Sequence, residues 1–251
     1  MISVPLGANA QSLAQRVWQR YTRASSVQVR AVSQFEDLSL EATPGAYEHA
    51  DPARWQQMEN EVRRLVGQQI TTHIAVRHPN RLYIWQKSAF GSFRSVCDGK
   101  VWHLQRQDGS TQRTRAPATL QQMTAAIYRA WLGLDDGNDA EVLHLLMVRS
   151  PALRDRLVRA REEPGPAPHL KHLTWSEPIA YQGLQGQGTI TCVVNVQTGD
   201  IQRVQYVYNV SSGAEARLNI RIAQRWDNSL LSKPPPDSLF RVEQGRGVRA
   251  R

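Results

Sequence analysis

Hydrophobic and polar residues alternate in three segments near the carboxyl end of the chain, at 189–196, 201–210 and 215–226. One side of the pattern carries Ile190, Cys192, Val194, Val204, Tyr206, Tyr208, Ile220, Ile222 and Trp226, and the other side carries Arg217, Arg221 and Arg225. Since successive side chains of a strand point to opposite faces, the alternation predicts β-strands with one apolar and one solvated face. Short turns separate the segments, so we expect the strands to be consecutive and antiparallel.

A run of shorter strands is predicted closer to the amino end. A first strand alternates over residues 26–35, and the segments that follow it lie at about 69–78, 81–88, 92–97, 100–106 and 111–114. Turns such as His78-Pro79-Asn80 and Asp98-Gly99 join these segments. Connections this short leave no room for crossover helices, which predicts antiparallel pairing throughout.

Two helices are predicted from their start and stop signals. Ser12 precedes an apolar pattern of period four and is a typical N-cap residue, which predicts a helix over 12–24. Pro52 stands at the first helical position of a second pattern, and Gly67 follows its end. These signals predict an inserted helix over about 52–66.

A longer helical region is predicted over about 118–162, where three segments carry apolar stripes. Leu120, Met123, Ile127 and Trp131 make the first stripe, and Asp139 is the expected cap of the second helix. The sequence EPGPAP, at 163–168, ends this region and is the best candidate for a linker.

The order of these elements predicts an α+β protein with one strongly curved antiparallel sheet, an unclosed β-barrel, whose concave apolar face is covered by helices. Residues 11–251 are expected to form a single domain. Residues 1–10 are set apart, because Ala8-Asn9-Ala10 has the A-x-A form of a signal-peptidase site. We interpret them as the remnant of a signal whose start lies upstream, although a chance match also fits, and we expect an exported, periplasmic protein.

The chain has 251 residues and a formal net charge of +9, with a pI of about 10.1. This charge suits an anionic partner such as a lipid headgroup, an anionic membrane surface or an acidic protein. Nucleic acid is not expected as a partner, since no helix-turn-helix or RNA-recognition signature occurs. The arginines of the last strand are more simply explained as a solvated sheet face.

No complete catalytic or metal-binding constellation is found in the sequence. His169 and His172 form an HxxH beside the proline-rich segment, without a cysteine or acidic ligand nearby. No G-x-S-x-G nucleophile elbow occurs. We therefore predict a protein that is not an enzyme and uses no cofactor and no metal. Cys97 and Cys192 both lie in predicted strands, and whether they pair is left open.

Three short motifs, taken in order, resemble the outer-membrane lipoprotein carrier (LolA-like) superfamily. They are VRHPNRLYIW at 76–85, DGKVW at 98–102 and SKPPPDSLFRV at 232–242. With the helical middle and the long strands, the resemblance covers most of residues 12–243. It implies an unclosed antiparallel barrel, closed on its concave face by helices, that holds the acyl chains of lipoproteins in the periplasm.

The resemblance also implies which residues line the hollow. Leu82 and Ile84 match the inward positions of the family's strand after the proline, and Trp102 and Leu104 follow on the next strand. The alternating strands near the carboxyl end complete the predicted lining with Val194, Tyr206, Ile220 and Ile222.

One departure from the family concerns the lid. Carriers have an arginine immediately before the proline that ties the helical lid shut, and here that position is His78. Arg77 is one residue earlier and is expected to point to the other face of the strand.

The predicted function is thus that of a non-catalytic periplasmic carrier that holds the acyl chains of a lipid or lipoprotein. The alternative is a structural or regulatory protein of the cell envelope with a filled core, which binds a protein partner by a sheet edge or a basic face. A structure in which the space between sheet and helices can be inspected distinguishes the two.

Overall fold

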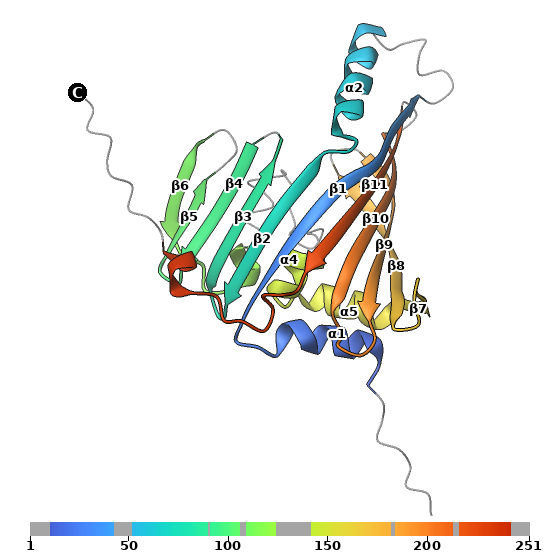
Figure 1. Cartoon of the computed structure of the whole chain (residues 1–251). Coiled ribbons are helices and arrows are strands. Elements are labelled where there is room, and N and C mark those ends of the chain that lie inside the picture. Colours follow the sequence, from blue (N-terminus) through green and yellow to red (C-terminus); the bar gives the residue numbers. More distant parts are fainter. Residues whose placement is uncertain are drawn as a thin grey trace, which may run out of the picture.

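A computed structural model describes residues 11–42, 52–89, 91–105, 109–123, 142–181, 184–212 and 216–241. Its strands are β1 (Ser26–Ala42), β2 (Gln69–Arg77), β3 (Arg81–Ser88), β4 (Gly91–Asp98), β5 (Val101–Gln105), β6 (Thr111–Arg115), β7 (Arg161–Pro164), β8 (Leu170–Tyr181), β9 (Leu184–Asn195), β10 (Ile201–Ser212) and β11 (Ala216–Asp227). In the described residues they form one antiparallel sheet of 11 strands (Figure 1).

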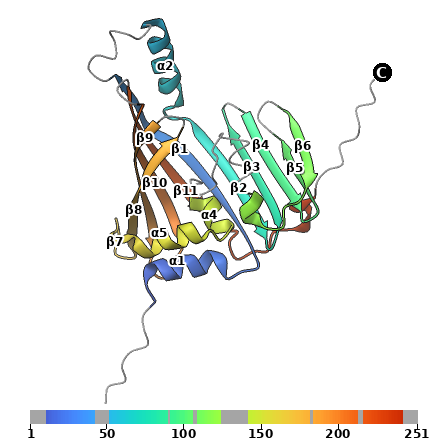
Figure 2. The same cartoon turned by 180° about the vertical axis from the view of Figure 1, so that it is seen from behind.

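The strand order is β6-β5-β4-β3-β2-β1-β11-β10-β9-β8-β7. The first strand therefore pairs with the last one in the middle of the sheet, and each half continues outwards through neighbours in sequence. The two edge strands, β6 and β7, do not pair with each other, so the sheet curves as a half-barrel without closing (Figures 1 and 2). The prediction of a single antiparallel, unclosed sheet is confirmed.

The described helices are α1 (Leu13–Thr22), α2 (Pro52–Leu65), α4 (Val142–Met147), α5 (Pro151–Arg159) and the 3-10 helix η3 (Asp237–Phe240). The first begins as predicted, because the Ser12 hydroxyl accepts a hydrogen bond from the backbone N–H of Gln15 and the Gln15 side chain accepts one from the Ser12 N–H. Helix α2 matches the predicted inserted helix. Both predictions rested on local start signals, which do not depend on the rest of the fold.

The predicted end of the helical region is wrong. Helix α5 stops at Arg159, and the polar segment that follows forms β7, in which Glu163 pairs with His172 of β8. The proposed linker at 163–168 is therefore part of a hairpin within the sheet. A segment without alternation can still become a strand when a neighbouring strand supplies the backbone partners. The predicted stripe residues Ile127 and Trp131 and the expected cap Asp139 lie outside the described residues.

Strand β1 is longer than the predicted 26–35 because it contains a β-bulge. Phe35 pairs with Ile222, whereas Asp37 pairs with Arg221, so Glu36 is an extra residue in this strand. The extra residue shifts the alternation by one position. Leu38 therefore points to the same face of the sheet as Phe35, although the two are three residues apart.

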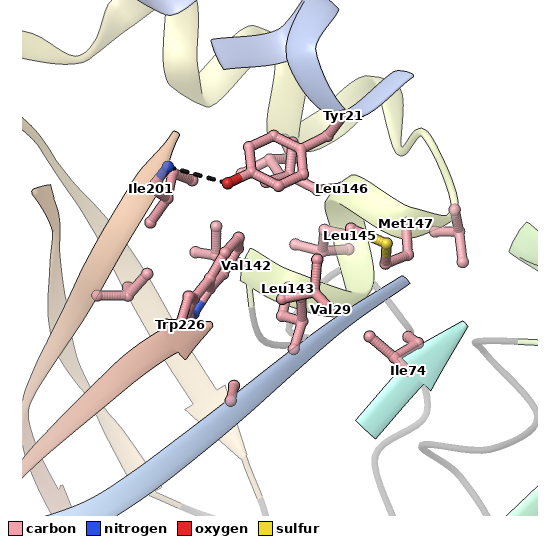
Figure 3. Close-up of a cluster of buried hydrophobic side chains, with 14 of the residues drawn as sticks. Tyr21, Val29, Ile74, Val142, Leu143, Leu145, Leu146, Met147, Ile201 and Trp226 are labelled. Carbon is pink, nitrogen blue, oxygen red and sulfur yellow. Dashed lines mark hydrogen bonds between the residues drawn. The ribbon is translucent and has the colours of Figure 1, made fainter. Parts of the chain in front are cut away.

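The hydrophobic core lies on one face of the sheet, which we call the inner face and define as the side of Val29, Ile74 and Tyr206. All residues of α4 are buried, and the backbone N–H of Val142 donates to the Tyr206 hydroxyl at 3.1 Å. Figure 3 shows α4 side chains packed against Val29, Ile74 and Trp226. Helix α4 thus lies on the inner face at the end of the sheet near α1.

Tyr21 anchors α1 to this core. Its ring meets Trp226 edge-on with centroids 5.6 Å apart. Its hydroxyl accepts a hydrogen bond from the backbone N–H of Ile201 at 2.9 Å (Figure 3). The same hydroxyl donates to Asn228 at 3.0 Å. Burial raises the pKa of this phenol, so it stays protonated and can make both bonds at once.

The last described segment lies against the opposite, outer face, where η3 contacts β3 and β4. The Arg77 guanidinium pairs with Asp237, donates to the Pro235 carbonyl at 2.9 Å, and lies 5.3 Å from the centre of the Phe240 ring. As expected, Arg77 points away from the inner face. It secures the Pro-Pro segment, which is one of the three motifs that carry the family resemblance.

Candidate ligand-binding face

All eight predicted lining residues lie on the inner face of the sheet. In one half, Leu82 is opposite Cys97, which in turn is opposite Trp102, and Ile84 connects in the same way through Ser95 to Leu104. In the other half, Val194 is opposite Ile201, and Tyr206 is opposite Ile222. Ile220 lies between Leu38 and Tyr208 in the same register. The predicted alternation is confirmed, and Arg221 is exposed on the other side.

The eight residues differ in how deeply they are buried. Leu82, Ile84, Trp102, Leu104, Val194 and Tyr206 are between 0% and 7% exposed and belong to the same hydrophobic cluster as α4. Ile220 and Ile222 are only half-buried. The predicted site is therefore divided into a filled part near the helices and a more open part farther along the long strands.

We call the more open part the upper inner face. It consists of the half-buried apolar residues Phe35 and Leu40 of β1, Leu218, Ile220 and Ile222 of β11, and Tyr208 of β10. Cross-strand pairing joins them into one surface, since Leu40 is opposite Leu218 and Tyr208 is opposite Ile220. Phe35, Leu40, Leu218 and Tyr208 were not among the predicted lining residues. Phe35, Leu218 and Tyr208 follow from the alternation of their own strands, but Leu40 does not, because the bulge at Glu36 shifts the alternation of β1 by one residue.

A glycine shapes one side of this surface. Gly188 of β9 is opposite Tyr208, and a Cβ at this glycine would come within 3.0 Å of the Tyr208 ring and 2.9 Å of the Ile179 methyl group. Such contacts are shorter than side chains tolerate. The absence of a side chain lets the tyrosine and the isoleucine lie against the sheet.

Several buried polar side chains lie among the apolar residues of the inner face. The Trp226 indole donates to Gln224, whose amide donates to Ser33, and the Trp102 indole donates to Ser95. Thr72 and Gln86 are directly opposite each other on β2 and β3, 0% and 4% exposed. Among the described residues, the Thr72 hydroxyl and the Gln86 side-chain carbonyl have no hydrogen-bond partner. Buried polar atoms of this kind are uncommon in native proteins.

His78, which directly precedes Pro79, carries a neutral imidazole. Burial, and then the nearby positive charge of Arg149, lowers the pKa of His78 to about 4. Arg149 lies in the turn between α4 and α5 and donates to the backbone carbonyl of Ala24 at 2.8 Å. The Arg149 guanidinium thus connects the turn between α4 and α5 to the chain just before β1.

Both cysteines are buried and free, so the structure answers the open question about their pairing. Cys97 is in β4 and Cys192 is in β9, which are six strands apart in the sheet. Burial raises the pKa of both thiols. They serve as small apolar residues of the core.

In the part of the chain that the structure describes, no group of three or more His, Cys, Asp or Glu residues is placed to hold a metal ion. His169 and His172, the HxxH of the sequence, lie in the β7–β8 hairpin region. Within the same described ranges, no helix is both long and apolar enough to span a membrane.

The fold and the site define a class of protein, an unclosed antiparallel half-barrel with an apolar inner face. No family model matches the sequence, and no curated protein matches it either. The function is therefore inferred from the residues of the chain itself.

Proposed function

We propose that the protein is a non-catalytic carrier that holds the acyl chain of a lipid or lipoprotein against the upper inner face, in the periplasm. The observation that carries this proposal is the row of half-buried apolar side chains of β11, Leu218, Ile220 and Ile222, flanked by Phe35 and Tyr208. This surface continues directly from the buried core, because Tyr208 and Ile222 also pack against the core cluster.

Hydrophobic contact alone supplies enough energy for this role. Each buried methylene group contributes about 0.8 kcal/mol, so ten of them contribute about 8 kcal/mol before the cost of ordering the chain. To bind an acyl chain, the residues of this surface need only be apolar and held in fixed positions. A carrier of this kind uses no catalytic group, no metal and no cofactor.

In this proposal the helices α1, α4 and α5 close the lower end of the half-barrel. The contacts that support it are those of α4 with β2 and Tyr206 and of α5 with β8. The hydrogen bond from Arg149 to Ala24 connects the turn between α4 and α5 to the chain just before β1. It takes the place of the family's lid arginine, which the neutral His78 does not supply.

A second candidate is an interaction protein of the cell envelope with a filled core. The observation that favours it is the deep burial of six of the eight predicted lining residues. A groove of about 780 Å³ on the outer face, with Arg203, Arg225 and His172 among its lining residues, is a place where an acidic partner would bind. In this case the upper inner face would be covered by protein rather than lipid.

The two candidates are separated by measuring lipid on the protein. Lipid extracted from protein purified from cells is analysed by mass spectrometry, and binding of a fluorescent fatty acid is titrated. The variant Ile220→Arg places a charge on the upper inner face, and Asn209→Arg adds the same side chain at an exposed position of the neighbouring strand. We expect Ile220→Arg to weaken fatty-acid binding more than about tenfold, because an unpaired charge on an apolar surface is costly, and Asn209→Arg to leave it unchanged.

Circular dichroism and thermal unfolding establish that both variants fold. If folded wild-type protein carries no lipid and does not bind the fatty acid, the carrier proposal fails and the interaction protein replaces it.

A further inference from the structure

A second, chemically different pocket lies at the edge of the sheet, between the end of α5 and β8. It has a volume of about 600 Å³. Its lining residues are Arg156, Arg159, Arg161, Thr174, Trp175, Ser176, Glu177 and Pro178. We call it the arginine pocket. The sequence analysis did not identify it, because Arg156, Arg159 and Arg161 all fell within the predicted helical region at 118–162.

The lining of the arginine pocket is positively charged. Its three arginines and one glutamate give a formal charge of +2 (+3 from arginine and −1 from Glu177). Arg156 pairs with Glu177 at 2.8 Å, and Arg161 pairs with Glu163, outside the lining, at 2.9 Å. Arg159 donates from Nε to the Asp155 backbone carbonyl at 3.2 Å. The exposed guanidiniums of Arg159 and Arg161 retain further N–H groups for a ligand, since each guanidinium carries five donors.

An unused donor lies in the same wall. The Trp175 side chain is 8% exposed, and its indole N–H has no hydrogen-bond acceptor among the described residues. An unpaired buried donor destabilises the folded state, so native proteins rarely contain one. An acceptor oxygen of a bound ligand would satisfy it.

Helix stabilisation alone does not account for these residues. Arg156 and Arg159 lie in the last turn of α5, where positive charges favour the helix dipole. Arg161 lies beyond the helix, in β7, and Trp175 comes from β8. Residues from three elements therefore bring donors to one pocket, while the carboxylate in its wall is already paired.

The pocket is separated from the upper inner face by a single strand, since β9 lies between β8 and β10. Strand β7 pairs with β8 only up to Thr174. From Trp175 onwards, within the described residues, β8 pairs only with β9. Glu177 of the pocket lining is opposite Gly188, which is opposite Tyr208 of the upper inner face. A ligand that lies along the inner face can therefore reach the arginine pocket at the open edge of the sheet.

We propose that the arginine pocket binds the phosphate group of an anionic lipid whose acyl chain lies along the upper inner face. The lipid part of this inference rests on the proposed function. Guanidinium groups match the tetrahedral oxygens of a phosphate by paired hydrogen bonds, and Trp175 adds a donor from the protein side. The net charge of the lining attracts the anion, and added salt weakens this attraction.

The test compares three probes: lysophosphatidic acid, a monoacylglycerol with the same acyl chain, and inorganic phosphate. Binding to the full chain is measured by isothermal titration calorimetry at low salt. The double variant Arg159→Gln and Arg161→Gln removes two charges from the pocket. The control Arg217→Gln and Arg221→Gln removes two exposed arginines from the outer face of β11.

We expect the pocket variant to bind lysophosphatidic acid at least about tenfold more weakly, while its affinity for the monoacylglycerol is unchanged. The control should bind both lipids like the wild type, and Ile220→Arg should weaken both. Unchanged affinity of the pocket variant for lysophosphatidic acid, or an equal loss in the control, would overturn the phosphate site.

The phosphate site and the carrier role can fail separately. If neither lipid binds but inorganic phosphate does, and the pocket variant abolishes that binding, then the site stands and the carrier proposal fails. If only the lipids bind, and the pocket variant makes no difference, then the carrier proposal stands and the phosphate site fails. Binding of an acidic peptide in place of all three probes would overturn both.

Discussion

The two ends of the inner face have the same alternating sequence pattern, but their side chains are buried to different extents. Near the helices, Val29 and Ile74 are 0% exposed and pack against α4. Farther along the long strands, Leu218 and Ile220 occupy equivalent alternating positions and remain half-buried. Alternation therefore determines the side of the sheet on which a residue lies. Its depth depends on what packs against that side, and the comparison shows where the half-barrel still has an apolar surface to offer a ligand.

The largest expected effect compares two isoleucines on that face. Ile74→Ala should lower the free energy of unfolding by about 2–5 kcal/mol, because it leaves a cavity in a filled core. Ile220→Ala removes the same atoms from a half-buried position and should cost about 1 kcal/mol or less. Urea unfolding of both variants measures the difference. Equal losses would mean that Ile220 is part of the same closed core and would remove the distinction.

A smaller effect is expected from pH, and it concerns the filled end. Complete burial on α4 lowers the pKa of His144 to about 4, and burial also lowers the pKa values of His73 and His78. The unfolded chain binds protons at these histidines below about pH 6.5, whereas the folded chain does so at His144 and His78 only near pH 4, and at His73 only below its ordinary pKa. The contribution of these histidines to stability should therefore be constant above pH 6.5 and fall as the pH drops from 6.5 to 4.

The expected loss at His144 is on the order of 1–3 kcal/mol by pH 4. The free energy of unfolding, measured by urea titration at several pH values, gives the slope. His144→Gln should reduce this slope without removing it, because His73 and His78 contribute in the same direction. A slope that is identical in the variant and the wild type would show that α4 does not bury this residue as described.

Much of the fold could be predicted from the sequence because its signals are local. The capped helix after Ser12, the inserted helix after Pro52 and the alternating strands each have a pattern that is complete within a few residues. Strand β7 could not be predicted in this way. Its residues neither alternate nor favour a strand, and they form one only because β8 supplies a partner.

The candidate site could be predicted in part, for a related reason. All eight predicted lining residues are on the inner face, since alternate residues of a strand point to the same face of the sheet. Which of them would be half-buried could not be predicted, because burial depends on helices far away in the sequence. The arginine pocket was missed because Trp175 and the arginines meet only through the packing of α5 against the edge of β8.

The central claim, that the upper inner face holds an acyl chain, is tested most directly by photo-crosslinking. A fatty acid that carries a diazirine near the end of its chain is bound to the purified protein and irradiated, and the labelled peptides are identified by mass spectrometry. The account predicts labels within 206–210 and 216–222, which contain Tyr208, Leu218 and Ile220, and weaker labelling in Ile220→Arg. Labels confined to the outer face, or no labelling of folded protein, would contradict it.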